Sequence, residues 1–369
     1  MDTNQKKFNL YVFLSTFSRN LIEVFIPIIL YKFGYSLKEV LFYYLFVNLF
    51  LIILTYPSIL FSKKYSNRYL SIIGIFSFVV VQILLTNIKN SILYLLSLSF
   101  FYSLYRIGYW LARRFYTLKV MPKDNVSMSY SWISIVNQVA LIVASYIGSI
   151  LLDFMSIELL TGISIVLFLI SLYPLYTLKF KHEDSSKKLD FIGTIKKIPL
   201  SNLYLFGAYE SITVIKFFFS LYLFIYVKDN YQTIGIMNLL TNVATITFVY
   251  FYGKKINDKK NYINLSIIFI VLVYIFKVNI TSYLLLLVAF FEGIATKMYE
   301  LSMSKEFYLL SKKFDYSNYN LVYEIVLGVF RSFILLVSFL FINDLKVMIY
   351  FSVILVFISI FVKFKDLRN

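Results

Sequence analysis

The chain of 369 residues is divided into about twelve apolar stretches by short polar loops, and its positive charge is sorted among those loops. Of the 36 Lys and Arg residues, 25 fall at the two chain ends and in every second loop. Only five fall in the other loops, namely Lys32, Lys38, Lys89, Lys228 and Lys346. Basic residues are retained on the cytoplasmic side when a membrane protein inserts. The pattern therefore predicts a chain that crosses the membrane many times and has both termini in the cytoplasm.

The composition excludes several classes of protein. Apolar residues make up 60% of the chain and charged residues 15%, whereas a soluble domain has roughly 25% charged residues. The net charge of +17 follows from the basic loops, so we expect no nucleic-acid partner. The absence of cysteine excludes disulfides and cysteine nucleophiles. We expect no cofactor and no metal site, because the single histidine, His182, lies in a charged loop beside Glu183 and Asp184.

The lengths of the apolar stretches fit transmembrane helices. A helix rises 1.5 Å per residue, so roughly 20 residues cross the hydrocarbon core. We predict helices over residues 8–33, 38–60, 69–88, 91–112, 127–152, 156–178, 200–227, 230–252, 261–279, 280–304, 317–342 and 345–364. They form an N-terminal half (residues 1–178) and a C-terminal half (residues 200–369), joined by a cytoplasmic linker (residues 179–199).

The linker has two interpretations, of which a flexible connection is favoured. The alternative is an amphipathic helix on the inner leaflet, with apolar residues toward lipid and lysines toward anionic headgroups. The apolar set is Leu189, Phe191, Ile192 and Ile195, and the basic set is Lys187, Lys188, Lys196 and Lys197.

Two pairs of matching loops indicate that the halves are duplicates. Residues 61–68 read FSKKYSNR and residues 252–259 read YGKKINDK, and LSII follows each, at 70–73 and 265–268. A second pair, RRFYTL at 113–118 and KEFYLL at 305–310, has nearly the same offset. Matches at corresponding loops with one offset are typical of repeated halves.

These features together resemble the major facilitator superfamily. In that family the loop after span two carries Gly, an Asp-Arg pair, a second Gly and two basic residues. Here Lys63 fits the basic position and Arg68 a later one, whereas Ser62 replaces the Asp and both glycines are missing. The loop after span four matches better, with Ala112-Arg113-Arg114 and Pro122-Lys123-Asp124. In span five, Ala144 and Gly148 keep the small residues that let two helices approach closely.

The resemblance implies an all-α polytopic membrane protein of twelve transmembrane helices in two six-helix halves, with spans one, four, seven and ten around a central cavity. Ionisable residues inside the spans are costly in hydrocarbon and indicate function. Most of them fall on these four helices: Arg19, Glu23, Arg106, Glu210, Lys216, Glu292, Lys297 and Glu300. Span eleven adds Glu324 and Arg331.

We assign roles to these residues by charge. Glu23, Glu210 and Glu292 lie nearest the midplane and are the proton-coupling candidates, because a buried carboxyl can bind and release a proton. Cations can bind a carboxylate or phosphate, so the substrate-binding candidates are Arg19, Arg106, Lys216 and Lys297. The gating or ion-pair candidates are Glu300, Glu324, Arg331, Lys63 and Arg113.

The spacing of these residues predicts some ion pairs. Arg19 with Glu23, and Lys297 with Glu300, share a helix face and are expected to pair. Glu324 and Arg331 lie two turns apart on one face. Glu210 and Lys216 point to different sides, so each is expected to pair with another helix. A purely structural role for all these pairs remains the alternative.

Uncharged polar residues also occur at membrane depth. Their expected role is hydrogen bonding between helices. They are Asn20, Asn48, Gln82, Asn137, Gln138, Asn238 and Asn242.

We predict a secondary active transporter in the cell membrane that moves a small organic solute by alternating access. It is expected to act as a monomer, with the lipid bilayer as its surroundings, with proton coupling, and with export favoured over uptake. An enzyme such as a membrane glycan polymerase or acyltransferase is one alternative, although its chemistry usually needs a large outer loop. A lipid-linked sugar flippase is the other, and it would place its cations along one continuous cavity.

Overall fold

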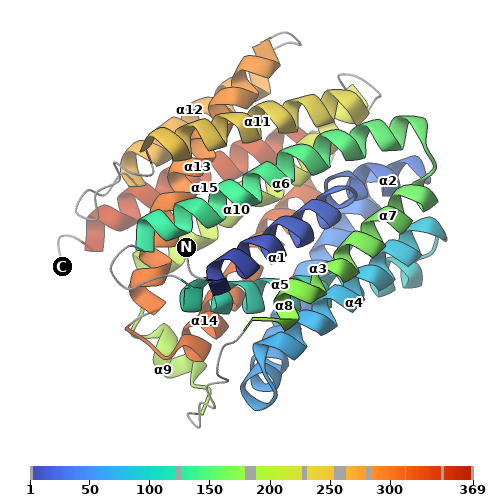
Figure 1. The fold of residues 1–369 in the computed structure, drawn as a ribbon. Coiled ribbons are helices and arrows are strands. Elements are labelled where there is room, and N and C mark those ends of the chain that lie inside the picture. The colour runs from blue at the N-terminus through green and yellow to red at the C-terminus, as the bar shows by residue number, and fades with distance from the viewer. Residues whose placement is uncertain are drawn as a thin grey trace.

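The computed structural model describes residues 3–120, 126–178, 188–226, 231–252, 263–279, 284–311, 313–341 and 345–366. Within these ranges the chain is helical and contains no strand (Figure 1). Some sequence expectations concern residues outside them: Pro122-Lys123-Asp124, His182, Lys187, Lys228, the Lys254-Lys255 turn and Lys312.

The N-terminal half contains the first six predicted spans. Its helices are α1 (Thr3–Asn20), the 3-10 turn η1 (Glu23–Phe25), α2 (Ile26–Lys32), α3 (Leu37–Lys64), α4 (Asn67–Thr86), α5 (Ile92–Val120), α6 (Val126–Phe154), α7 (Ile157–Ile170) and α8 (Leu172–Tyr176). The first span is thus divided into α1, η1 and α2, and the sixth into α7 and α8.

The C-terminal half contains the other six. Its helices are α10 (Leu200–Tyr226), α11 (Tyr231–Tyr252), α12 (Ile263–Asn279), α13 (Leu284–Ser311), α14 (Tyr316–Leu340) and α15 (Leu345–Asp366), with the short α9 (Phe191–Ile195) before them. Seven of the described helical segments are long and apolar enough to cross a membrane by length and composition. α13 is more polar, because it carries Glu292, Lys297 and Glu300.

The first span is broken beside one of the candidate residues. Pro27 lies in the first turn of α2 and has no backbone N–H to continue the hydrogen bonds of α1. The chain therefore passes through the turn at Glu23–Phe25 between the two helices. The break places Glu23 in the turn after α1, where its carboxylate meets Tyr102 of α5.

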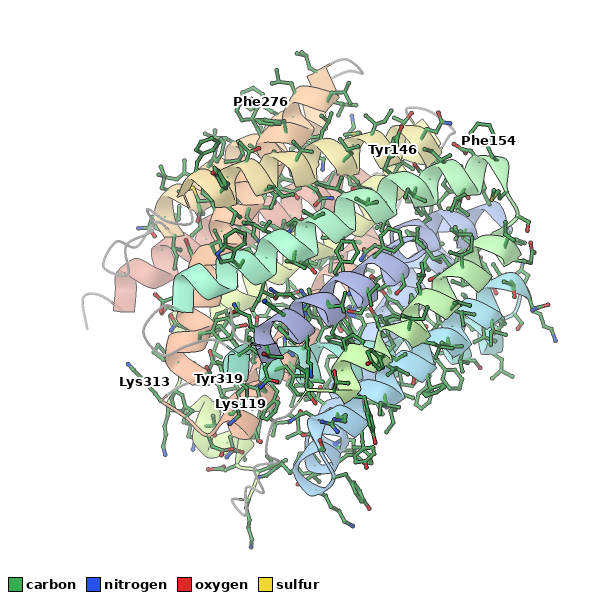
Figure 2. All side chains as sticks on the ribbon, viewed as in Figure 1. Lys119, Tyr146, Phe154, Phe276, Lys313 and Tyr319 are labelled. Atoms are coloured by element: carbon green, nitrogen blue, oxygen red, sulfur yellow. The ribbon has the colours of Figure 1, made fainter. Side chains whose placement is uncertain are left out.

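Apolar side chains cover the flanks of the bundle. Tyr146, Phe154 and Phe276 are exposed and lie on its outer surface, whereas Lys119 and Lys313 lie at the end near α9 (Figure 2). The first residues of α1 and the last of α15 lie at this same end (Figure 1). An apolar flank with basic ends is typical of a bundle in a bilayer.

The two halves meet along two pairs of helices, α6 with α11 and α3 with α14. Small residues allow close approach within the N-terminal half, as the sequence predicts for Gly148, and also between the halves at Gly235. A Cβ on Gly148 would lie 2.5 Å from the carbonyl oxygen of Leu21 in the chain after α1, and one on Gly235 of α11 would lie 2.2 Å from the Ser149 Oγ of α6. Side chains larger than hydrogen cannot be accommodated at these crossings without movement.

The part of the linker that the structure describes packs on protein, contrary to the amphipathic-helix alternative. Leu189 and Phe191 pack against a buried cluster formed by Ile59, Leu70, Ile107, Leu111 and Leu321. Asn318 of α14 accepts a hydrogen bond from the Asp190 N–H at 2.7 Å. Only five residues of this stretch are helical, and Ile192 is exposed. Leu189 and Phe191 therefore face a protein surface between α3, α5 and α14 rather than lipid.

Candidate functional site

A cavity of about 450 Å³ lies between the halves, within the usual size of small-molecule sites. Its lining comes from α1, α5, α10 and α13, as the sequence predicts, and also from α6, α11 and α14. Of the 35 lining residues, 14 are uncharged and polar and ten are ionisable. Polar groups therefore face the cavity together with apolar atoms, which suits a solute that has both polar and apolar parts.

The ionisable lining residues carry excess positive charge among the described side chains. The cations are Arg19, Arg106, Arg113, Arg114, Lys297 and Arg331. The acids are Glu23, Glu210, Glu300 and Glu324. Each of the four acids pairs with one of the cations, so two arginines have no carboxylate partner.

The predicted pair on the first span is present. Arg19 Nε lies 2.9 Å from Glu23 Oε2, and both side chains are buried. The Tyr102 hydroxyl donates to the other oxygen, Glu23 Oε1, at 2.6 Å. Arg19 also donates to the Tyr105 hydroxyl at 3.1 Å. The carboxylate is therefore held on both oxygens at the helix break.

The predicted pair on the tenth span is also present. Lys297 Nζ lies 2.5 Å from Glu300 Oε1, three residues further along α13. The lysine is buried, whereas the Glu300 side chain is 30% exposed. This pair presents its carboxylate to the cavity.

Pairs between helices account for the remaining two acids. Glu210 of α10 pairs with Arg331 of α14 at 2.7 Å between Oε2 and Nε, in agreement with the expected partner on another helix. Glu324 of α14 pairs with Arg114 of α5, across the two halves. Glu324 and Arg331 therefore have separate partners on separate helices. Arg114 was not a candidate from the sequence, although the Ala112-Arg113-Arg114 motif contains it.

The two arginines without a carboxylate are Arg106 and Arg113. Arg113 donates to Asn137 Oδ1 and to the Tyr109 hydroxyl, each at 2.8 Å. Arg106 forms no hydrogen bond or ion pair with any described residue, although it interacts electrostatically with Glu23, Glu210 and Arg331. An uncompensated guanidinium in a cavity can bind a carboxylate or phosphate with paired hydrogen bonds.

Glu292 lies apart from this group, contrary to the expected shared cavity. It is not among the described lining residues. Its Oε2 pairs with Lys277 Nζ of α12 at 2.6 Å, and its Oε1 accepts from the Tyr274 hydroxyl at 2.7 Å. Lys277 lies over the Phe219 ring at 3.5 Å. This buried pair joins α12 to α13.

Two further candidates lie outside the described lining. Lys63 is in the last turn of α3, where a lysine interacts favourably with the helix carbonyl end. Lys216 lies in α10, and its side chain is outside the described part of the structure.

Uncharged polar residues of α6 and α11 form a part of the site that sequence reasoning missed. Asn137, Gln138, Asn238 and Asn242 all line the cavity, whereas their expected role was hydrogen bonding between helices. Asn137 does bond Thr16 of α1. The signal was present as spacing, since positions 238, 241, 242 and 245 share one helix face.

Comparisons with known proteins agree with this architecture. The sequence profile of the Major Facilitator Superfamily matches residues 8–364. No curated protein sequence matches the chain.

Solved structures of similar fold include a bacterial homologue of the iron transporter ferroportin in its outward-facing state, with a TM-score of 0.74, 13% identity and full coverage of both chains. The same homologue with soaked iron has a TM-score of 0.71 and 14% identity over 99% of both chains. FucP, a transporter of the superfamily in its outward conformation, has a TM-score of 0.69 and 15% identity over 98% of both chains. Identities this low show the fold alone. With the profile match over nearly the whole sequence and twelve spans around a charged central cavity, this chain belongs to the major facilitator superfamily.

Proposed function

We propose that the protein is a proton-coupled exporter of a small organic anion. Residues 1–178 and 200–369 would rock around the central cavity, opening it alternately to each side of the cell membrane. One chain encloses the whole cavity, which supports function as a monomer. The basic end near α9 supports cytoplasmic termini.

The position of Arg106 is the observation that supports an anionic substrate. Arg106 lines the cavity between the halves and forms no hydrogen bond or ion pair with any described residue. It is half-buried, and a substrate carboxylate or phosphate could form paired hydrogen bonds with its guanidinium. A substrate bound there would contact both halves, as alternating access requires.

The negative charge of the proposed substrate supports export rather than uptake. The inside-negative membrane potential drives anions out of the cell, by about 2.3 kcal/mol per charge at 100 mV. Glu23 and Glu210 line the same cavity and are the proposed proton carriers. Each is paired with an arginine in the structure, Glu23 with Arg19 and Glu210 with Arg331.

Transport by the purified protein in liposomes tests this function. A panel of organic anions, neutral solutes and cations is offered with an imposed pH gradient. We expect uptake of anions only, and a rise in half-saturating concentration of roughly ten-fold or more for Arg106→Gln, because a charge-assisted hydrogen bond is worth about 1.5–3 kcal/mol. Lys119→Gln is the control, since it is exposed on the same helix. Transport of cations, or of neutral solutes alone, would contradict the proposal.

A further inference from the structure

The part of the cavity wall formed by α6 and α11 contains two rows of uncharged polar side chains. On α6 the row includes Ser134, Gln138 and Ser145, and on α11 it includes Asn238, Thr241 and Thr245. Residues three, four and seven apart share one helix face. Because α6 and α11 pack against each other, the rows lie side by side along the cavity.

Several atoms in these rows have unused hydrogen-bonding capacity. Ser134 Oγ, Gln138 Oε1 and Asn238 Nδ2 are buried and have no hydrogen-bond partner among the described residues. Ser134 is only 5% exposed and Gln138 only 7% exposed. Buried polar groups in proteins are nearly always hydrogen-bonded, so these atoms indicate a ligand with several polar groups.

The threonines add acceptors to the same surface. Thr241 and Thr245 each donate a hydrogen bond to the backbone carbonyl four residues earlier, at 2.9 Å. The lone pairs of their hydroxyl oxygens can therefore still accept a hydrogen bond. The rows thus offer amide N–H donors, an amide carbonyl and hydroxyl oxygens within one cavity. Hydroxyl groups match this mixture, since each both donates and accepts.

Packing of α6 on α11 does not require these atoms. The close approach of the two helices is made by Gly235 on Ser149 and the Ser145 carbonyl, not by the side chains of Ser134, Gln138 or Asn238. A role confined to joining the helices would leave these side chains bonded to one another or to backbone. Ser134 Oγ, Gln138 Oε1 and Asn238 Nδ2 form no such bond with any described residue.

We propose that the substrate is a polyhydroxylated organic anion, a sugar acid or a sugar phosphate. Arg106 would bind the acid group, and the rows on α6 and α11 would bind the hydroxyl groups. The inference rests on the proposed function and adds the substrate class. An apolar anion would leave the polar rows unsatisfied, and a neutral sugar would leave Arg106 uncompensated.

A transport assay with four labelled solutes separates the contribution of the acid group from that of the hydroxyl groups. Purified protein in liposomes is assayed for counterflow of glucuronate, glucose 6-phosphate, glucose and benzoate. We expect at least one of the two sugar anions to be preferred to both glucose and benzoate by ten-fold or more. Comparison of glucuronate with glucose 6-phosphate identifies the acid group as carboxylate or phosphate.

Single substitutions test which residues produce the preference for the sugar anion. Arg106→Gln is expected to lower the preference for the sugar anion over glucose at least five-fold. Gln138→Leu and Asn238→Leu are expected to lower the preference for the sugar anion over benzoate at least five-fold, with little change in benzoate transport. Thr247→Val is the matched control for Thr241→Val. Both hydroxyls bond a carbonyl of their own helix, and Thr247 is exposed on the other side of α11.

The outcomes distinguish a wrong substrate class from a wrong proposed function. Transport of benzoate as good as that of the sugar anions would overturn the inference and leave an organic-anion transporter. Transport of glucose as good as that of the sugar anions would overturn the acid-binding role of Arg106. If no solute of this panel or of the wider panel moves, although the protein is folded and inserted, the proposed function fails together with the inference.

Discussion

Arg114 near the end of α5 forms an ion pair with Glu324 of α14, and this pair joins the two halves. Arg114 also lies over the Tyr323 ring, 5.3 Å from its centroid. Nearby, the Tyr316 hydroxyl donates to the Leu111 carbonyl at 3.5 Å. These contacts lie at the end of the bundle where α9 packs, and they join the halves beside the cavity, which Arg114, Tyr323 and Glu324 line.

Removal of this pair is expected to favour opening at the α9 end. Glu324→Gln should raise the labelling rate of Ser304→Cys, a cavity-lining position, by about five-fold for a pair worth ~1 kcal/mol. The chain has no native cysteine, so maleimide labelling in membranes has no background from the protein. Lys64→Gln, at the exposed end of α3, should leave the rate unchanged. The charge swap Arg114→Glu with Glu324→Arg should restore the slow rate. Faster labelling in the swap than in the single variant would show that the ion pair does not hold the two halves together at this end.

Proton coupling is expected to depend on Glu23 or Glu210. At least one of Glu23→Gln and Glu210→Gln should abolish pH-driven transport, because glutamine keeps the shape of the side chain but does not titrate. Exchange without a gradient should survive better, since it needs no net proton movement. The assay is substrate uptake into liposomes with and without a pH step. Glu39→Gln is the control, because glutamine also suits the helix-start position of Glu39. Unchanged gradient-driven transport in both variants would return these carboxylates to a structural role.

Glu292 is expected to affect stability rather than coupling. Lys277→Met leaves the buried Glu292 carboxylate without its cation and should cost about 3–5 kcal/mol of folding free energy. The double variant Lys277→Met, Glu292→Leu removes both charges and should recover most of this loss. Thermal unfolding of the purified protein in detergent measures the series. A double variant as unstable as Lys277→Met would show that the pair is not the cause.

Gly148 is expected to tolerate no side chain. The Cβ of Gly148→Ala would lie 2.5 Å from the backbone oxygen of Leu21, so α6 must move away, at a cost of about 1–3 kcal/mol. Gly162 of α7 offers the opposite case, because a Cβ there meets no atom within 4 Å. Gly162→Ala should stabilise α7 by about 0.5–1 kcal/mol, the usual gain in a helix interior. Unfolding temperatures should therefore shift in opposite directions, and equal shifts would contradict the crossing.

The proposed orientation is tested by single cysteines. Lys63→Cys and Lys188→Cys should react with a membrane-impermeant maleimide only after the cells are permeabilised. Lys89→Cys and Lys346→Cys should react in intact cells. Labelling of position 188 from outside would reverse the orientation.

The sequence by itself determined the features that depend on neighbouring residues. The twelve spans follow from the lengths of the apolar runs, and the helices of the structure coincide with them. The pairs Arg19–Glu23 and Lys297–Glu300 follow from helix geometry, because residues three or four apart lie on one face. The break at Glu23 was missed, since Pro27 inside an apolar run was read as part of one continuous span.

Only the tertiary structure decided which distant side chains meet. Glu210 and Arg331 are 121 residues apart, and Arg114 and Glu324 are 210 apart, so helical spacing carries no information about either pair. Periodicity predicts which face a residue occupies on its helix, but not how that helix is rotated against its neighbours. The rotation of α13 placed Glu292 against α12, outside the cavity, and the rotations of α6 and α11 turned Gln138 and Asn238 into it. Those rotations are set by side-chain packing between helices that are far apart in the chain, and this is the physical reason the cavity could not be derived from the sequence.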